Sequence, residues 1–387
     1  MSVVRDKHFH LQVARPSLPR TAALLPYLRL IDESRWYTNG GPLVRRFEAR
    51  VADVVRSADG AVAHFMTVSS ATTGLILALQ AAVGPRRGAC LVPSWTFAAT
   101  PCAVMSAGLT PHFVDVERDT WLADRHQIAD LAGRDPGRFV ALLLVQRSGY
   151  EVELGPWREL AAAHGLALVV DAADCFDCVR PGPEAQVVSL HACKALGAGE
   201  GGFITSTNRA LIDQARQLAN FGFTAHRVSD AAGINGKMSE YAAAVALAAL
   251  DAWPQTRDCW LERAAAYRRI LKDRGLDLLA PANAACATAL VDLGGPFAAA
   301  AAAALLTDGI EARRWWGEGC HRQPAFANCP AAPMPVTETL AEHILGLPFH
   351  VDLDDDALTL VVDLVMRSLR QGQSHGPSDP PGGDFCA

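Results

Sequence analysis

A chain of 387 residues is too long for one typical hydrophobic core, and its length predicts two domains. The formal net charge is −6 and no basic run is present, which argues against nucleic acid as a partner. No apolar stretch reaches about 18 uncharged residues. The first residues hold no apolar signal segment, so we predict no membrane span, no secretion and a cytoplasmic location.

Ten cysteines are spread along the chain, which is not the arrangement of a small disulfide-stapled domain. Cys175 and Cys178 form a CxxC within DAADCFDC, but no second CxxC and no nearby histidine pair accompanies them. We therefore expect no metal site and interpret the cysteines as reduced, packed thiols of a cytoplasmic enzyme.

Short apolar runs alternate with amphipathic segments over residues 1–250. The segment NGGP opens a helix with proline in its first turn, and Leu43, Phe47 and Val51 then share one face. Further along we expect helices over 72–83, 97–107 and 156–164, and strands over 89–92, 112–116, 140–145, 166–170, 187–190 and 202–205. This alternation predicts a mainly parallel sheet with helices on both faces.

The pattern changes near Leu250, where we place a domain boundary. Beyond it we expect a long helix over 256–273, a strand over 287–293, an alanine-rich helix over 298–304 and a last helix over 355–369. The sequence thus predicts a large domain (1–250, with an N-terminal arm) and a smaller C-terminal domain (251–370). The tail 371–387 is rich in Gly, Pro and Ser and is expected to be disordered.

Candidate functional residues follow the strands, because ligands of open α/β sheets bind beyond the carboxyl ends of the strands. Asp171 ends LALVVD, and a carboxylate there is costly to bury unless it is paired. A protonated pyridine nitrogen is one such partner. The alternative is an aspartate that caps the next helix.

Lys194 ends SLHACK and precedes a glycine-rich turn that lets the backbone approach a ligand. Among small and apolar neighbours a lysine can lose its proton by desolvation, as a Schiff-base lysine must. The alternative is a solvated surface lysine.

Two more segments complete the set. VSSATTG, at 68–74, is rich in hydroxyls and opens a helix, whose N-terminus can bind phosphate or simply be capped by a side chain. Trp95, in PSWTF, follows a strand and can stack on a flat cofactor or pack in the core. A phosphate site, a stacking ring, a carboxylate and an amine together match the needs of pyridoxal 5′-phosphate (PLP).

From Arg15 to Leu369 the sequence resembles the sugar aminotransferases of the DegT/DnrJ/StrS family, which are fold-type I PLP enzymes. The matching segments, in order, are TNGGPLVRRFE, VSSATTGL, VPSWTFAATPCAVMSAGLTPHFVDV, VVDAADCFD, SLHACKALGAGEGGF, NFGF, GINGKMSEYAAA and LGLPFH. The resemblance implies a seven-stranded, mainly parallel sheet in the large domain and a smaller C-terminal α/β domain.

The resemblance also implies a role at each matching position. Lys194 is expected to form the Schiff base and Asp171 to pair with the ring nitrogen. The other implied cofactor contacts are Trp95 on the ring, Ala71, Thr72 and Ser189 on the phosphate, and Asn235 on the phosphate of the neighbouring subunit's cofactor. The last contact implies a homodimer with shared active sites.

Three features depart from the family's pattern. Ala71 replaces a glycine of the phosphate turn, although its N–H can still donate. Asp174 stands where Gln or His is common near the cofactor's phenolic oxygen, so a carboxylate would face an anionic group. The loop QRSGY, at 146–150, is atypical and is expected to bear on substrate choice. Lys194 itself is retained, whereas family members that run dehydrations carry histidine.

The expected reaction is a ping-pong transamination from L-glutamate to a keto sugar carried on a nucleotide, with Lys194 moving the proton. The alternatives are a keto-cyclitol or other natural-product ketone as acceptor, and a regulatory or sensor protein without turnover. Arg314 and Lys237 are candidates for the acceptor's phosphates, and His321 for its sugar. Alternatively, Arg314 pairs with a surface carboxylate, the adjacent tryptophans pack between domains, and His321 is structural.

Overall fold

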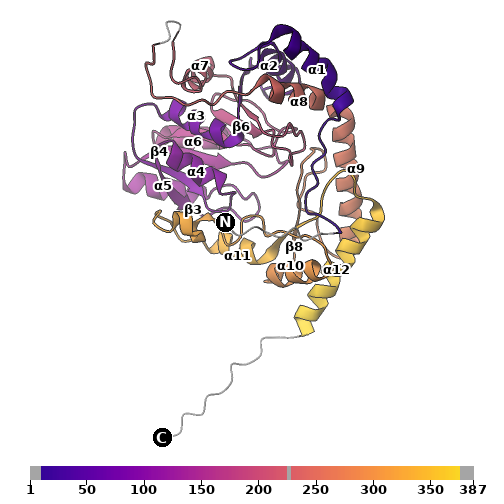
Figure 1. The fold of residues 1–387 in the computed structure, drawn as a ribbon. Coiled ribbons are helices and arrows are strands. Elements are labelled where there is room, and N and C mark those ends of the chain that lie inside the picture. Colours follow the sequence, from indigo (N-terminus) through magenta and orange to yellow (C-terminus); the bar gives the residue numbers. More distant parts are fainter. Residues whose placement is uncertain (1–9, 225–227, 375–387) are drawn as a thin grey trace.

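A seven-stranded mixed sheet lies at the centre of the computed structural model, which describes residues 10–224 and 228–374 (Figure 1). The strand order is β1-β7-β6-β5-β4-β2-β3. Strands β2 to β6 run parallel, while β7 is antiparallel to both β6 and β1. The strands are β1 (His64–Val68), β2 (Ala89–Pro93), β3 (Thr110–Val114), β4 (Phe139–Val145), β5 (Ala167–Asp171), β6 (Ala185–Ser189) and β7 (Gly202–Ser206). The predicted sheet is confirmed.

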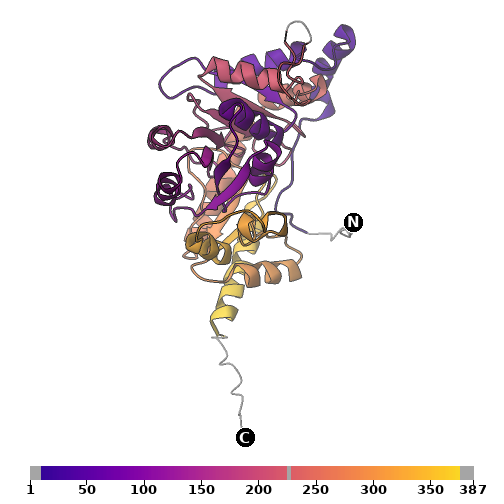
Figure 2. The ribbon, with the colours of Figure 1, turned by 90° about the vertical axis from the view of Figure 1, so that its left-hand side faces the viewer.

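Helices cover both faces of this sheet (Figure 2). Val169 and Val170 of β5 alternate between two separate buried clusters, as side chains of a strand do. Helices α3, α4 and α7 pack on the Val169 side, and α2, α5, α6 and α8 on the Val170 side. The helices are α1 (Thr21–Ser34), α2 (Pro42–Val54), α3 (Ala71–Val83), α4 (Ala99–Ser106), α5 (Arg125–Arg134), α6 (Gly155–Ala163), α7 (Arg209–Leu218) and α8 (Glu240–Asp251).

The C-terminal part contains a two-stranded antiparallel sheet, β8–β9. The 20-residue helix α9 leads into it from α8 (Figure 1). The elements of the C-terminal part are α9 (Trp253–Lys272), β8 (Ala289–Asp292), α10 (Ala298–Thr307), the 3-10 turns Cys320–Arg322 and Pro324–Phe326, α11 (Pro335–His343), β9 (Ile344–Leu347) and α12 (Asp355–Ser374). The domain boundary near Leu250 stays a prediction.

The N-terminal arm lies along the C-terminal part. Leu11 forms a bridge with Ile310, and the Phe349 N–H donates to the Val13 carbonyl oxygen over 3.1 Å. None of the helices among the described residues has both the length and the apolar character needed to cross a membrane.

Strand β3 begins and ends two residues earlier than the sequence pattern predicts. It includes Pro111, which a strand can hold when it lies at the sheet edge, as β3 does. The strand ends before Asp115, whose buried carboxylate accepts from the N–H groups of Val116 (2.9 Å) and Thr337 (2.8 Å). Tertiary contacts with α11 therefore set this strand end.

Other boundaries also differ from the expectations. Helix α4 begins at Ala99, and α12 runs to Ser374, so the first four residues of the expected tail are helical. The sequence holds no helix-breaking proline between Leu369 and Pro377, which allows this extension. The remaining tail residues lie outside the described part of the chain. Strands β1 and β9 and helices α1, α5, α7, α8 and α11 were not predicted.

The start of α2 depends on a carboxylate from α8. Buried Glu240 accepts from the N–H groups of Leu43 (2.7 Å) and Val44 (3.1 Å), which have no partner inside the first helical turn. A Cβ on Gly41 would lie 2.6 Å from the Glu240 carboxyl carbon, so glycine is required there. The segments NGGP and MSE therefore meet at one helix terminus.

We expect Glu240→Ala to lower the free energy of unfolding by about 2 kcal/mol, because it leaves two buried N–H groups without acceptors. Urea unfolding followed by circular dichroism measures the change. Glu33→Ala, at an exposed position of α1, is the matched control. Equal stability of the two variants would contradict the role of Glu240.

Candidate active site

Asp171 ends β5 with its carboxylate buried at the carboxyl edge of the parallel strands. One oxygen accepts from the Thr100 hydroxyl over 2.8 Å and the other from the Ala173 N–H over 3.1 Å. Burial raises the pKa of Asp171, and these two hydrogen bonds oppose the rise. Turns rather than a helix follow directly, so Asp171 is not a helix cap. A cationic ring nitrogen would offset the cost of this burial.

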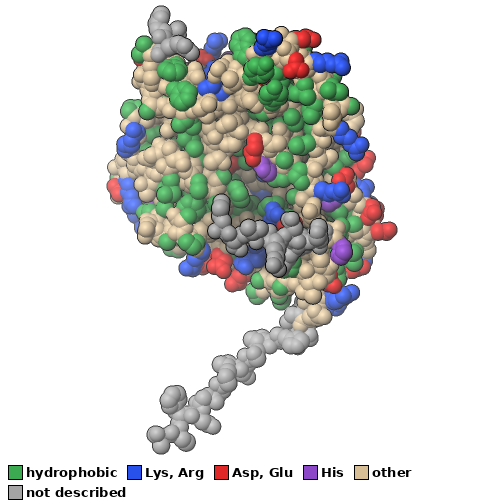
Figure 3. Space-filling view, in the orientation of Figure 1, with side chains coloured by type: hydrophobic (Ala, Val, Ile, Leu, Met, Phe, Trp, Pro, Cys, Tyr) green, Lys and Arg blue, Asp and Glu red, His purple; other side chains and the backbone are tan. Residues whose placement is uncertain are grey.

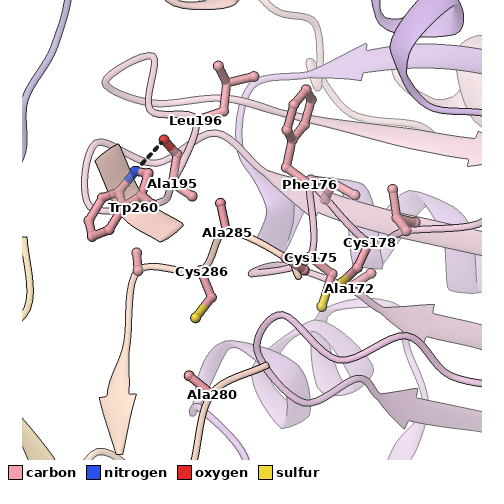
Figure 4. Close-up of a cluster of buried hydrophobic side chains, with 14 of the residues drawn as sticks. Ala172, Cys175, Phe176, Cys178, Ala195, Leu196, Trp260, Ala280, Ala285 and Cys286 are labelled. Atoms are coloured by element: carbon pink, nitrogen blue, oxygen red, sulfur yellow. Dashed lines mark hydrogen bonds between the residues drawn. The ribbon is translucent and has the colours of Figure 1, made fainter. Parts of the chain in front are cut away.

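Lys194 lies in the turn between β6 and β7. The Lys194 N–H donates to His191 carbonyl oxygen over 2.9 Å, and the indole of Trp260 donates to the Ala195 carbonyl oxygen over 3.2 Å (Figure 4). The Nζ atom of Lys194 lies 3.8 Å from Oδ1 of Asp174. Helix α9 thus holds the backbone beside the lysine, while a carboxylate faces its amine.

Opposing effects set the protonation of Lys194. Burial lowers the pKa of the Lys194 ammonium, but the electrostatic effect of the acidic groups around it, first of all Asp174, outweighs burial, so the pKa is raised. The N-terminal arm closes one side, where residues 14–17 and Lys194 line a cavity of about 20 Å³. In the orientation of Figure 1, the space-filling view shows a hollow near the middle of the molecule with a basic side chain inside it (Figure 3).

The residues expected to bind the phosphate lie close to one another. Helix α3 begins at Ala71 and Thr72, and a Cβ on Gly202 would lie 3.0 Å from the Ala71 nitrogen. Gly202 in turn pairs with Ser189 in the β6–β7 register. The missing side chain of Gly202 therefore lets the N-terminus of α3 approach the end of β6, where both could bind one phosphate.

Trp95 is packed inside a cluster of tryptophans. It is 4% exposed, and its ring meets the edges of Trp121 and Trp316 at centroid distances of 6.1 and 4.8 Å. Phe97, two residues further on, is 63% exposed. The Thr100 N–H donates to the Phe97 carbonyl oxygen over 3.1 Å, one turn before the contact with Asp171. We therefore propose Phe97 rather than Trp95 as the ring that stacks on the cofactor.

Asn235 is exposed in the loop before α8. The carbonyl oxygen of the next residue, Gly236, accepts from the Ser69 N–H over 2.9 Å, which ties this loop to the α3 phosphate turn. Lys237 donates to the side-chain oxygen of Asn220 over 2.9 Å and lies over the Phe221 ring. The exposure of Asn235 leaves it accessible to a second chain.

Arg314 donates to the Ala341 carbonyl oxygen over 3.2 Å, and within the described residues it forms no ion pair with a carboxylate. Trp316 does pack, on Trp95 and Trp121. Arg314 and Lys237 lie in separate parts of the chain and are not brought into contact within one chain.

His321 lies beside Ser94, with its Nδ1 2.6 Å from the Ser94 hydroxyl oxygen. Burial and then the charge of Arg322 lower the pKa of His321, although Glu338 opposes them. A neutral imidazole held by Ser94 fits a structural role as well as contact with a sugar.

The loop 146–150 is tied to the main chain of Asp171 and to the carboxylate of Asp174. The Gln146 N–H donates to the Asp171 carbonyl oxygen over 2.9 Å, and the Ser148 hydroxyl donates to the Asp174 carboxylate. Arg147 lies between the rings of Trp121 and Tyr150, 4.1 and 4.3 Å from their centroids. The atypical sequence of this loop therefore shapes the site directly.

The side chains at this edge of the sheet fit PLP: a lysine for its carbonyl carbon, a buried carboxylate for its ring nitrogen, and a helix N-terminus for its phosphate. The fold and this set of groups define a PLP-dependent aminotransferase. The sequence model of the DegT/DnrJ/EryC1/StrS aminotransferase family matches residues 21–366, and the chain belongs to that family.

Similar proteins agree with this assignment. The chain is 35% identical to the crystallised aminotransferase DesI, solved with its TDP-sugar product, with a TM-score of 0.83 and coverage of 94% of each chain. It is 27% identical to a putative PLP-dependent aminotransferase of Bacillus cereus, with a TM-score of 0.84 and coverage of 92% and 99%. It is also 27% identical to the Escherichia coli dTDP-4-amino-4,6-dideoxy-D-glucose transaminase, covering 92% of this chain and 98% of that one.

We expect Phe97→Ala to weaken PLP binding about fivefold, because stacking of an aromatic ring contributes on the order of 1 kcal/mol. Fluorescence titration of cofactor-free protein measures the affinity. Phe97→Tyr keeps the ring and should retain the parental affinity. If Trp95→Phe weakens binding more than Phe97→Ala does in folded protein, the assignment of Phe97 fails.

Proposed function

We propose that the protein transfers an amino group from L-glutamate to a keto sugar, and that this acceptor is a nucleotide-linked keto-deoxysugar. The observation that carries the proposal is the placement of Lys194 beside Asp174, near buried Asp171, at one edge of the sheet. Bound PLP supplies an electron sink for the carbon that loses its proton.

The residues of the chain supply the remaining steps. Lys194 would hold PLP through the carbonyl carbon of the cofactor, and its amine would move the proton of the donor's α-carbon as a general acid and base. Asp171 keeps the ring nitrogen positively charged. Ala71, Thr72 and Ser189 hold the phosphate, and Phe97 lies against the ring.

Two observations support a nucleotide-linked acceptor. DesI was solved with a TDP-sugar product, and the Escherichia coli relative is named for a dTDP-linked amino sugar. Arg314 has no carboxylate partner in the part of the chain that the structure describes, which leaves its guanidinium able to bind a phosphate. A keto-cyclitol or another uncharged ketone is the alternative acceptor.

The working unit is proposed to be a homodimer in which Asn235 reaches the partner's cofactor phosphate. Supporting features are the exposure of Asn235 and the exposed apolar side chains on the same stretch of chain, Phe221 and Ile234. Lys237 lies next to them and is proposed to act with the partner's site. The acceptor's phosphates would then bind near the subunit interface.

The test uses purified, PLP-loaded protein. Borohydride reduction and peptide mapping should find the cofactor on Lys194, and L-glutamate should give one equivalent of 2-oxoglutarate per site. Lys194→Ala should give none. A panel of keto nucleotide sugars and a keto-cyclitol, incubated with glutamate, is then read by mass spectrometry.

Each outcome decides between the alternatives. An aminated nucleotide sugar supports the proposal, whereas product from the cyclitol alone overturns the acceptor. PLP on Lys194 without formation of 2-oxoglutarate favours a regulatory protein. An adduct on another lysine overturns the site.

Mixing two inactive variants tests the shared site. Lys194→Ala and Asn235→Ala homodimers, mixed and re-equilibrated, should recover part of the activity, because some heterodimers carry one intact site. Activity and native mass spectrometry are measured together. Proven subunit exchange without recovery would argue that each site is completed within one chain.

A further inference from the structure

We infer that Asp174 is a positioning residue that holds Lys194 as an ammonium ion in the cofactor-free protein and thereby slows PLP attachment at neutral pH. The inference rests on the proposed function, because it concerns the same lysine. Asp174 Oδ1 lies 3.8 Å from Lys194 Nζ, with side-chain exposures of 10% and 25%. At this depth a charge pair interacts more strongly than at the surface.

Hydrogen bonding orients the Asp174 carboxylate. The Thr288 hydroxyl donates to the Ser148 oxygen over 2.8 Å, and Ser148 uses its single proton to donate to Asp174. The chain of donors therefore ends on Asp174 as an acceptor. The Gly149 N–H also donates to the Asp174 carbonyl oxygen over 3.2 Å, which fixes the backbone.

Of the groups near the lysine, Asp174 has the largest effect in raising its pKa. Burial raises the pKa of both the Cys175 and the Cys193 thiols, so both are neutral at pH 7. Asp171 already accepts from Thr100 and Ala173. On the arm side, Arg15 lines the same cavity and lies 3.8 Å from the Asp352 carboxylate.

The inference follows from a difference in charge. In the resembled family, neutral Gln or His is common where this chain carries Asp174. A neutral side chain would leave burial to lower the pKa of Lys194, whereas the carboxylate raises it. Asp174, which is one of the departures from the family's pattern, is therefore the residue whose carboxylate faces the Lys194 amine.

The consequence concerns attachment of the cofactor. Lys194 must first lose a proton to solvent, after which Nζ forms a C=N bond with the aldehyde carbon and the aldehyde oxygen leaves as water. The neutral fraction of the amine grows tenfold per pH unit below its pKa. Attachment should therefore accelerate as the pH rises, and removing the Asp174 charge should accelerate it at neutral pH.

The test measures Lys194 in cofactor-free protein. Competitive labelling with acetic anhydride from pH 6 to 11, read by peptide mass spectrometry, gives its titration curve. In the parent protein the midpoint should lie at or above the ordinary lysine value of about 10.4. In Asp174→Asn the midpoint should fall by about one unit or more, with about tenfold faster labelling at pH 8.

Two control variants separate the charge from other effects. Ser148→Ala keeps the carboxylate and should leave the midpoint near the parental value. Asp130→Asn, at an exposed position of helix α5, removes a charge that is not among those acting on the pKa of Lys194, and it should leave the midpoint unchanged. As a second readout, PLP uptake at pH 7.5, followed by absorbance, should be faster in Asp174→Asn alone.

An unchanged midpoint in folded Asp174→Asn would overturn the inference. If that variant does not fold, a parental midpoint below the ordinary lysine value would overturn it equally. Labelling of Lys194 is independent of turnover, so this result and the glutamate assay can fail separately.

Discussion

A carboxylate buried at the end of β5 is the constraint on which the site depends. Within the described residues the Asp171 carboxylate accepts two hydrogen bonds, from Thr100 and Ala173, and burial raises its pKa. Such a group is stable as an anion only beside positive charge. The fold therefore leaves a buried carboxylate without a counter-charge at this point, and the cationic ring nitrogen of the proposed cofactor would supply one.

Long-range contacts place the other groups around that point. Trp260 of α9 fixes the turn that carries Lys194, and Gly202 lets α3 approach β6. Small side chains of the segment before β8, including Cys286, lie beside the Cys175–Cys178 turn (Figure 4). Because this turn also carries Asp174, contacts with the C-terminal part help to set the position of a charge next to the reacting lysine.

Much of this could be predicted from the sequence, because apolar runs mark buried strands and polar residues at their ends mark the ligand edge. Asp171 was located in this way, at the observed end of its strand, whereas the resemblance implied Ser189. The resemblance also pointed to Trp95 as the stacking ring. The packing of Trp95 against Trp121 and Trp316, which favours Phe97 instead, depends on residues elsewhere in the chain. The end of β3 was likewise set by tertiary contacts that no local pattern contains.

The charge of Asp174 affects the site differently in the cofactor-free and in the cofactor-bound protein. Without cofactor, its carboxylate and the Lys194 ammonium neutralise each other inside the protein. With PLP held by Lys194, the same carboxylate would favour a protonated nitrogen at this position. Ser148 and Thr288 hold the carboxylate in place from the loop after β4 and from the start of β8. The protonation of the reacting nitrogen therefore depends on how firmly the C-terminal part packs against this turn.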